Sequence, residues 1–394
     1  MMKRLPRIAA FCLYCLVLQE AALRVVFPVP EILNFDRGTY SPTLNDTGRQ
    51  ARSTLANARF FWKSDPDGVE FIHDLNLYGF RDPMWRLQPK GAGPRVAFVG
   101  DSMVEGFMAE ASSTIPAAFR NELAALDDKG DVLNLGVGAS GLREYTLLIR
   151  DAVPLFRPDH LILVLYVNDF SRTEFDAGWL ENALEPEVAR VWVPRLYYVI
   201  RGLWANRPIA PRWRTKPFAF VNAVPDPRNP WSDSSRAAVL ERFVKPEIAE
   251  AMKEARFNPY LVNRFKNWQR LLLEPVDLSE PIVALNEYVA GYSCKLWVVY
   301  LPSPLQVSDH YLPYQLEFSA GPAQSLMGEP YQLHARSLEE ATRELGVPFL
   351  NLTPSLRQQE VASRPMYWRY DGHMKAEGYV SAGKTIFSWW QMNR

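Results

Sequence analysis

From residue 95 onward, short apolar runs alternate with stretches in which apolar residues recur at helical spacing. The apolar runs predict β-strands at residues 95–100, 131–137, 160–169, 295–304 and 347–352. The helical spacing predicts helices at residues 113–126, 141–153 and 337–347, the last with Ser337 as its N-cap, and a further helix at the C-terminus. This alternation predicts an α/β fold, a doubly wound parallel sheet with helices on both faces.

A long insertion at residues 171–280 interrupts the alternation. Between Val188 and Pro225 it contains no Asp or Glu, and arginines are interleaved with tryptophans and tyrosines. This mixture suits a membrane interface or an anionic glycolipid, and it equally suits a solvated cap whose aromatic side chains pack inward. The pattern divides the chain into an N-terminal segment at residues 1–29, a polar extension at residues 30–94, and a main domain at residues 95–394 that carries the insertion as a lid.

The N-terminal segment is similar to the charged and apolar regions of a secretory signal. Lys3, Arg4 and Arg7 precede an apolar run from Ile8 to Leu18. No small-x-small cleavage site follows, so we expect an uncleaved inner-membrane anchor more than the cleaved signal of a secreted protein. The basic residues would stay in the cytoplasm, which places the domain on the extracytoplasmic, periplasmic side. An ordinary amphipathic helix is the third interpretation.

Charge and cysteine content exclude some classes of protein. The chain has 44 basic and 44 acidic side chains, which argues against a nucleic-acid-binding protein because such proteins usually carry a basic excess. Cys12 and Cys15 lie in the N-terminal apolar run, and Cys294 precedes a predicted strand. We therefore expect no disulfide framework and no cysteine zinc site, and a buried thiol at Cys294.

Polar residues gather where the predicted strands end, which is where ligands bind in open α/β sheets. They are Asp101 and Ser102, the glycine-rich GVGASG at 136–141, Asn168 and Asp169, Ser303 and Gln306, and Asp371 and His373. The spacing of GVGASG also matches the dinucleotide-binding pattern, with Asp169 as its acid. However, GVGASG does not belong to the first strand–helix unit, and Asp169 lies farther along the chain than that pattern places the acid.

Ser102, His373 and Asp371 have the residue types of a nucleophile, a base and an orienting acid. A serine becomes nucleophilic when a base lies within hydrogen-bond reach and a third group fixes the tautomer of that base. The backbone N–H of Ser102, one N–H of the 136–141 turn and the Asn168 side chain are candidate donors to an oxyanion. Each residue alone also has a structural interpretation: a helix cap for Ser102, a turn for Asn168 and a loop for His373.

The set as a whole resembles the SGNH/GDSL hydrolase superfamily. The matching motifs are GDS at 100–102, NLGVGASG at 134–141, YVND at 166–169 and DGH at 371–373, in the order of that family. NLYGFRDP at 76–83 resembles an element that precedes the GDS motif in a membrane-associated bacterial branch. The resemblance implies a flavodoxin-like three-layer α/β/α fold over residues 95–394.

The resemblance also assigns roles. Ser102 would be the nucleophile and the first oxyanion donor, Asn168 the side-chain donor, and Asp371 and His373 the acid and base. The donor glycine of the second motif falls on Ala139, and Gly138 lies one residue earlier, so either could supply the backbone N–H. Tyr166 replaces the glycine of the third motif, which predicts a narrower pocket.

The implied activity is hydrolysis of an ester through an acyl-enzyme on Ser102, without a metal or cofactor. The expected substrate is an acylated small molecule, glycan or lipid, with an O-acetyl or lipid ester. Two alternatives stay open. One is an O-acetyltransferase in which a hydroxyl of an exported polysaccharide replaces water, and the other is a non-catalytic protein that binds a glycan or lipid.

Overall fold

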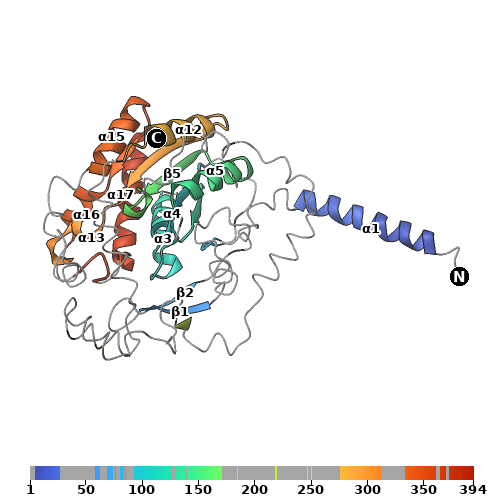
Figure 1. Cartoon of the computed structure of the whole chain (residues 1–394), viewed down its shortest axis with the longest axis horizontal. Coiled ribbons are helices and arrows are strands. Elements are labelled where there is room, and N and C mark those ends of the chain that lie inside the picture. The colour runs from blue at the N-terminus through green and yellow to red at the C-terminus, as the bar shows by residue number, and fades with distance from the viewer. Residues whose placement is uncertain are drawn as a thin grey trace, which may run out of the picture.

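The structure, a computed structural model, describes residues 5–26, 58–62, 69–73, 76, 80–83, 85, 93–126, 129–138, 140–170, 184, 218–219, 246, 250, 276–311, 333–360, 364–369 and 372–394. Its centre is a five-stranded parallel sheet (Figure 1). The strands are β3 (Arg95–Gly100), β4 (Asp131–Gly136), β5 (His160–Leu165), β7 (Lys295–Tyr300) and β8 (Phe349–Asn351). Their order in space is β4-β3-β5-β7-β8, the order of a doubly wound, flavodoxin-like sheet. The predicted fold class is confirmed.

Alternate residues of each strand enter two separate cores. Val96 and Phe98 of β3 pack into the first core, and Ala97 and Val99 into the second. The first core is covered by α4 (Ile115–Ala125), α13 (Pro304–Val307), α16 (Thr353–Gln359) and α17 (Ala376–Asn393). The second is covered by α5 (Leu142–Phe156), α12 (Ser279–Ala290) and α15 (Leu333–Glu344). The result is three layers, with helices on both faces of the sheet (Figure 1).

A second, smaller sheet joins two parts of the chain that the sequence keeps apart. Its order is β2-β1-β6, with β1 at Ala58–Trp62, β2 at Val69–His73 and β6 at Phe218–Ala219. β1 is antiparallel to β2 and parallel to β6. A strand of the predicted insertion therefore pairs with a strand of the N-terminal extension. Most of residues 171–280, and with it the predicted lid, lies outside the described residues.

The remaining elements are short, apart from the N-terminal helix. They are α1 (Leu5–Val26), α3 (Ser102–Glu105) and the 3₁₀ helices Ala111–Ser113, Val167–Asp169 and Asp309–Tyr311. Cys294 is buried, as predicted.

Several predicted ends differ from the structure for local reasons. β5 ends at Leu165, where the chain turns into a 3₁₀ helix, so the predicted strand 160–169 is too long. α15 begins at Leu333, and Ser337 lies inside it with its hydroxyl donating to the Val276 carbonyl at 2.8 Å. Ser337 is therefore not the N-cap. No helix is predicted from the sequence at α12, whose first residues fall within the range assigned to the insertion.

The predicted membrane anchor is wrong. Among the described residues, no helix is both long enough and apolar enough to cross a bilayer. The reason lies in α1, where Gln19, Glu20 and Arg24 follow the apolar run from Ile8 to Leu18. That run is shorter than the roughly 20 apolar residues that a spanning helix needs. The inner-membrane localisation rests on that span and is corrected with it.

Candidate active site

Ser102 lies where β3 leaves the sheet and the chain enters α3. Asp101 caps this helix, because its Oδ1 accepts a hydrogen bond from the Met103 N–H at 2.8 Å. Gly106 ends the helix with φ 79°, and the side chain of Thr114 fills the space that a Cβ there would need. This strand–turn–helix holds Ser102, which is 8% exposed, at the carboxyl edge of the sheet.

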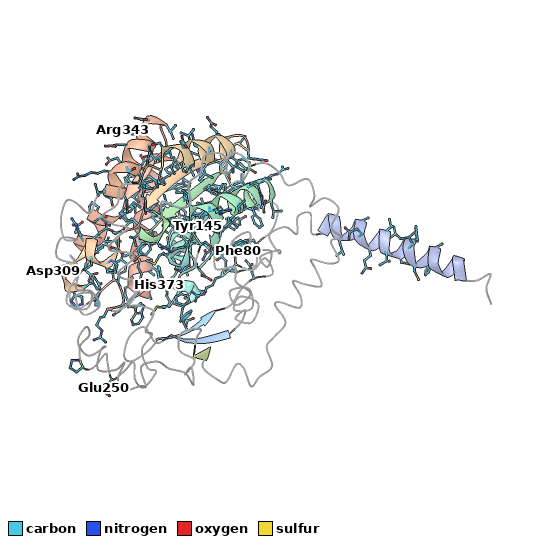
Figure 2. The ribbon with its side chains drawn as sticks, viewed as in Figure 1. Phe80, Tyr145, Glu250, Asp309, Arg343 and His373 are labelled. Carbon is cyan, nitrogen blue, oxygen red and sulfur yellow. The ribbon has the colours of Figure 1, made fainter. Side chains whose placement is uncertain are left out.

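His373 reaches Ser102 across 271 residues of chain. Its Nε2 lies 2.7 Å from the Ser102 Oγ, and the residue is buried. Figure 2 labels the position of His373 in the domain. The nitrogen–oxygen distance is within hydrogen-bond range, as is required between a general base and the hydroxyl whose proton it takes. The pair can therefore do what nucleophilic catalysis needs, because the imidazole accepts the proton as the serine oxygen attacks.

Two backbone hydrogen bonds and one ring contact hold His373 and its neighbours. The Tyr166 hydroxyl donates to the Gly372 carbonyl at 2.9 Å, and the Trp368 N–H donates to the His373 carbonyl at 3.1 Å. The ring of Phe107 lies 4.9 Å from the imidazole. Tyr166 is itself buried, so it ties β5 to the histidine loop, a role that the sequence did not indicate.

Asn168 is aimed at the Ser102 turn by Asp101. Its Nδ2 donates to the Asp101 Oδ2 at 2.9 Å, which leaves the second N–H of the amide for another acceptor. Asp169 has a different role. Its carboxylate accepts from the Tyr145 hydroxyl at 2.9 Å and from the Tyr166 N–H at 2.8 Å, so it fixes the turn after β5. β3 and β5 flank the point where the strand order reverses, the usual ligand site of such sheets.

The predicted backbone donors do not all remain available. The Gly138 N–H donates to the Glu105 Oε2 at 2.8 Å, so in this structure it is bound to a carboxylate. Ala139 and Asp371 lie outside the described residues. The Ser102 N–H is the first N–H of α3, a position that finds no acceptor inside a helix. Of the candidate oxyanion donors, Ser102 and Asn168 are thus the two that the structure brings to the same turn.

The glycine turn is a poor phosphate site. Besides the bond from Gly138 to Glu105, the Gly141 N–H donates to the Glu144 Oε2 at 3.0 Å, and burial raises the pKa of Glu144. Dinucleotide-binding turns offer such N–H groups to a pyrophosphate. Here two acidic side chains hold them, which weighs against the nucleotide-dependent alternative.

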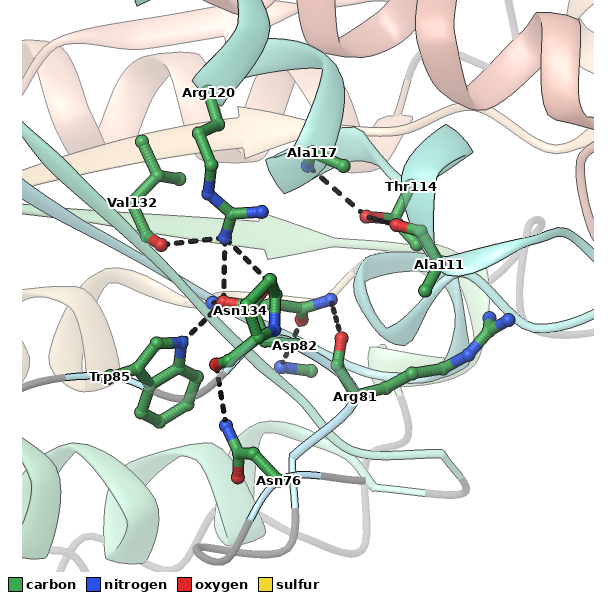
Figure 3. Close-up of polar contacts among 12 residues, drawn as sticks. Asn76, Arg81, Asp82, Trp85, Ala111, Thr114, Ala117, Arg120, Val132 and Asn134 are labelled. Atoms are coloured by element: carbon green, nitrogen blue, oxygen red, sulfur yellow. Dashed lines mark hydrogen bonds and ion pairs between the residues drawn. The ribbon is translucent and has the colours of Figure 1, made fainter. Parts of the chain in front are cut away.

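A polar network that the sequence did not predict lies beside the site. The Asp82 carboxylate accepts hydrogen bonds from Arg120, from the Trp85 indole at 2.6 Å and from the Asn134 N–H at 3.0 Å (Figure 3). Burial raises the pKa of Asp82, and the Arg120 guanidinium opposes that rise. The signal in the sequence is the NLYGFRDP stretch at residues 76–83, and nothing in that stretch identifies the partners of Asp82.

Comparison with known proteins gave matches among solved structures alone. No family model matches the sequence, and no curated protein is similar to it. A G-D-S-L family lipolytic protein from Desulfitobacterium hafniense is 11% identical, with a TM-score of 0.35, over 75% of this chain and 99% of that one. A lipase/acylhydrolase from Enterococcus faecalis is 11% identical, with a TM-score of 0.38, over 75% of this chain and 94% of that one.

A catalytic mutant of an acetylxylan esterase from Geobacillus stearothermophilus is 10% identical, with a TM-score of 0.38, over 76% of this chain and 95% of that one. The first of the three structures is named for the G-D-S-L group that the sequence motifs resemble. Identities of this size do not transfer an activity to this chain.

Proposed function

We propose that this protein is a serine esterase of the SGNH type that transfers an acyl group from an ester to Ser102 and then to water. The observation that carries the proposal is the 2.7 Å contact between the Ser102 Oγ and the His373 Nε2. It lies at the carboxyl edge of a doubly wound sheet, beside the side chain of Asn168. This geometry supports nucleophilic catalysis better than helix capping, because Asp101 already caps α3.

In the acylation step, the Ser102 Oγ attacks the ester carbonyl carbon while its proton passes to the His373 Nε2. The carbonyl oxygen becomes an oxyanion, which in this proposal the Ser102 N–H and the Asn168 Nδ2 stabilise. When the tetrahedral intermediate collapses, the bond to the leaving alcohol breaks and His373 gives that alcohol the proton. In this proposal Asp371 accepts from the other imidazole nitrogen, as the sequence predicts.

Deacylation repeats these steps with water as the nucleophile. His373 takes a proton from water, the hydroxide adds to the acyl carbon, and Ser102 leaves with the proton that His373 returns. A sugar hydroxyl in place of water would give the O-acetyltransferase, so the two activities differ only in the acceptor. The substrate class proposed is an acylated small molecule, glycan or lipid.

The Ser102→Ala variant tests the mechanism. We expect it to lose hydrolysis of p-nitrophenyl acetate and all labelling by a fluorophosphonate probe, because both need the serine oxygen. Ser303→Ala is the matched control, a buried serine after β7, and should label at the parent rate. Mass spectrometry of the labelled peptide locates the probe.

Two results separate the alternatives. A parent protein that is never labelled at Ser102 would be a binding protein, and the esterase proposal would be wrong. A parent protein that is labelled, but releases p-nitrophenol faster when a polysaccharide acceptor is added and transfers the acetyl group to that acceptor, would be the transferase.

A further inference from the structure

We propose that Arg81 is a positioning residue that holds the turn carrying Ser102 in its reactive geometry. The inference rests on the proposed function, since it concerns the nucleophile of that reaction. Arg81 lies in the NLYGFRDP stretch at residues 76–83, which precedes β3 in the chain. The sequence singles out this stretch by its resemblance but predicts no role for the arginine.

The guanidinium of Arg81 joins two carbonyl groups just beyond α3. Its Nη1 donates to the Gly106 carbonyl and its Nη2 to the Ala109 carbonyl, and the residue is 1% exposed. A planar guanidinium that donates through two nitrogens fixes the spacing and direction of both acceptors. The backbone from Ser102 to Ala109 is thereby held at its far end, while Asp101 holds its near end.

The backbone of Arg81 is itself bound to β4. Its carbonyl accepts from the Asn134 Nδ2 at 3.2 Å, and the Asn134 Oδ1 accepts from the Gly136 N–H at 2.9 Å (Figure 3). The Asp82 carboxylate binds the Asn134 N–H from the other side. The Ser102 turn and the start of the glycine turn therefore share one support.

Contacts within the 76–83 stretch hold the backbone just before Arg81. The Asn76 N–H donates to the Phe80 carbonyl at 2.8 Å, and the Phe80 N–H returns a bond to the Asn76 Oδ1 at 3.1 Å. The Phe80 ring is fully buried and lies 5.2 Å from the Trp85 ring. These contacts fix the backbone of Phe80 and so the position from which the Arg81 side chain starts.

A row of aromatic rings extends the support to the base. The Arg81 guanidinium lies 5.5 Å from the centre of the Phe71 ring, Phe71 lies 5.1 Å from Phe107, and Phe107 lies 4.9 Å from His373. Phe107 follows Gly106, whose carbonyl Arg81 binds. A shift of this backbone would therefore move both members of the Ser102–His373 pair.

Arg95 provides a matched control at the opposite edge of the sheet. It is also 1% exposed. It donates to the Phe156 carbonyl at 2.8 Å and forms an ion pair with Asp131 at 2.8 Å. Both arginines thus hold other parts of the protein from a buried position, but Arg95 stands at the amino ends of β3 and β4, away from Ser102.

The experiment compares Arg81→Lys with Arg95→Lys in the full chain. A lysine keeps the charge but does not span two carbonyls in the fixed plane of a guanidinium. We expect Arg81→Lys to lower kcat for p-nitrophenyl acetate and the rate of fluorophosphonate labelling by about 10- to 100-fold, as small misplacements of a nucleophile do. KM and the midpoint of the pH profile should stay close to those of the parent, because the substitution replaces neither a residue that contacts substrate in the proposed mechanism nor an ionisable group of the Ser102–His373 pair.

Arg95→Lys should have a lower unfolding free energy in a urea titration. Its folded molecules should still react with the fluorophosphonate probe at the parent rate. The inference is overturned if Arg81→Lys labels at the parent rate, or if the two variants lose labelling equally. Should Arg81→Lys not fold, Arg81→Met takes its place with the same expected loss, because it leaves no unpaired cation in the core.

Hydrogen exchange separates this inference from the proposed function. Arg81→Lys should speed amide exchange in the peptide covering residues 102–110, and Arg95→Lys should not, whether or not the protein is an esterase. If the parent never labels, the proposed function fails and exchange alone decides the positioning role. Equal exchange in both variants overturns that role.

Discussion

Two carboxylates beside Ser102 are bound to N–H groups of the site. Asp101 accepts from the Met103 N–H and from Asn168, and Glu105 accepts from the Gly138 N–H. An uncompensated negative charge there would oppose the oxyanion that an esterase forms. The N–H donors partly offset the negative charge of both carboxylates. Asp101 and Glu105 can therefore hold the backbone of the turn with less repulsion toward an oxyanion.

Removing one oxygen atom from Tyr166 tests whether its hydroxyl helps to position His373. Tyr166→Phe removes the hydroxyl that binds the Gly372 carbonyl and should cost about 1 kcal/mol of unfolding free energy. We also expect kcat for p-nitrophenyl acetate to fall several-fold, since His373 follows Gly372. Tyr300→Phe is the control, because that buried hydroxyl binds the Gln306 side chain at 2.9 Å. An equal loss of kcat in both variants would contradict the role given to Tyr166.

Between elements, α17 packs closely against α4. A Cβ added at Gly383 would lie 2.5 Å from the Ile115 carbonyl oxygen and 2.6 Å from the Ala118 Cβ. Alanine in a helix is favoured over glycine by about 1 kcal/mol, while overpacking costs about 1–3 kcal/mol. One atom in the clash is a backbone carbonyl oxygen and the other an alanine Cβ, and a change of side-chain rotamer moves neither, so the clash should outweigh the gain in helix propensity.

We therefore expect Gly383→Ala to lower the unfolding free energy by roughly 1–2 kcal/mol in a urea titration. Ser388→Ala, at an exposed position of the same helix, should stay within about 0.5 kcal/mol of the parent. A Gly383→Ala protein as stable as the parent would mean that α17 can shift away from α4.

The sequence predicts a strand or helix well when the residues of that element themselves carry its hydrophobic pattern. The continuous apolar runs of β3, β5 and β7 identify strands buried on both faces. The same runs overestimate the length of β5, because Tyr166 and Val167 are apolar for reasons of core packing after the strand has ended. An apolar run marks burial, and burial continues past the hydrogen bonds that define a strand.

The support around Ser102 is less predictable, because its signal is not local. Ser102, Asn168 and His373 were found because open sheets gather strand-end residues at one edge. Arg81 and Asp82 belong to no strand end, and a charged pair in a turn-rich segment ordinarily indicates a solvated loop. Their partners are backbone carbonyls and an asparagine on other elements, which only the assembled fold brings near.

At the scale of the whole molecule, His160 couples stability to pH. It begins β5, and its Nδ1 accepts the Trp297 indole N–H of β7 at 3.0 Å. Its ring also lies 5.3 Å from the Trp390 ring of α17. Burial lowers the pKa of His160 below the usual 6.5, although Asp159 opposes this. A protonated Nδ1 could no longer accept from the indole, so protonation disfavours the contact between the strands.

The sign of the effect follows from proton uptake. As pH falls below about 6.5, this histidine binds a proton in the unfolded chain before it does so in the folded one, so the unfolding free energy decreases. His160→Phe keeps an aromatic ring but has no titrating group, and it loses the acceptor at every pH. The difference in stability between parent and variant should therefore shrink from pH 7.5 to pH 5 in urea titrations. A difference that stays constant would show that His160 titrates alike in both states, because every other ionisable group is common to the two proteins.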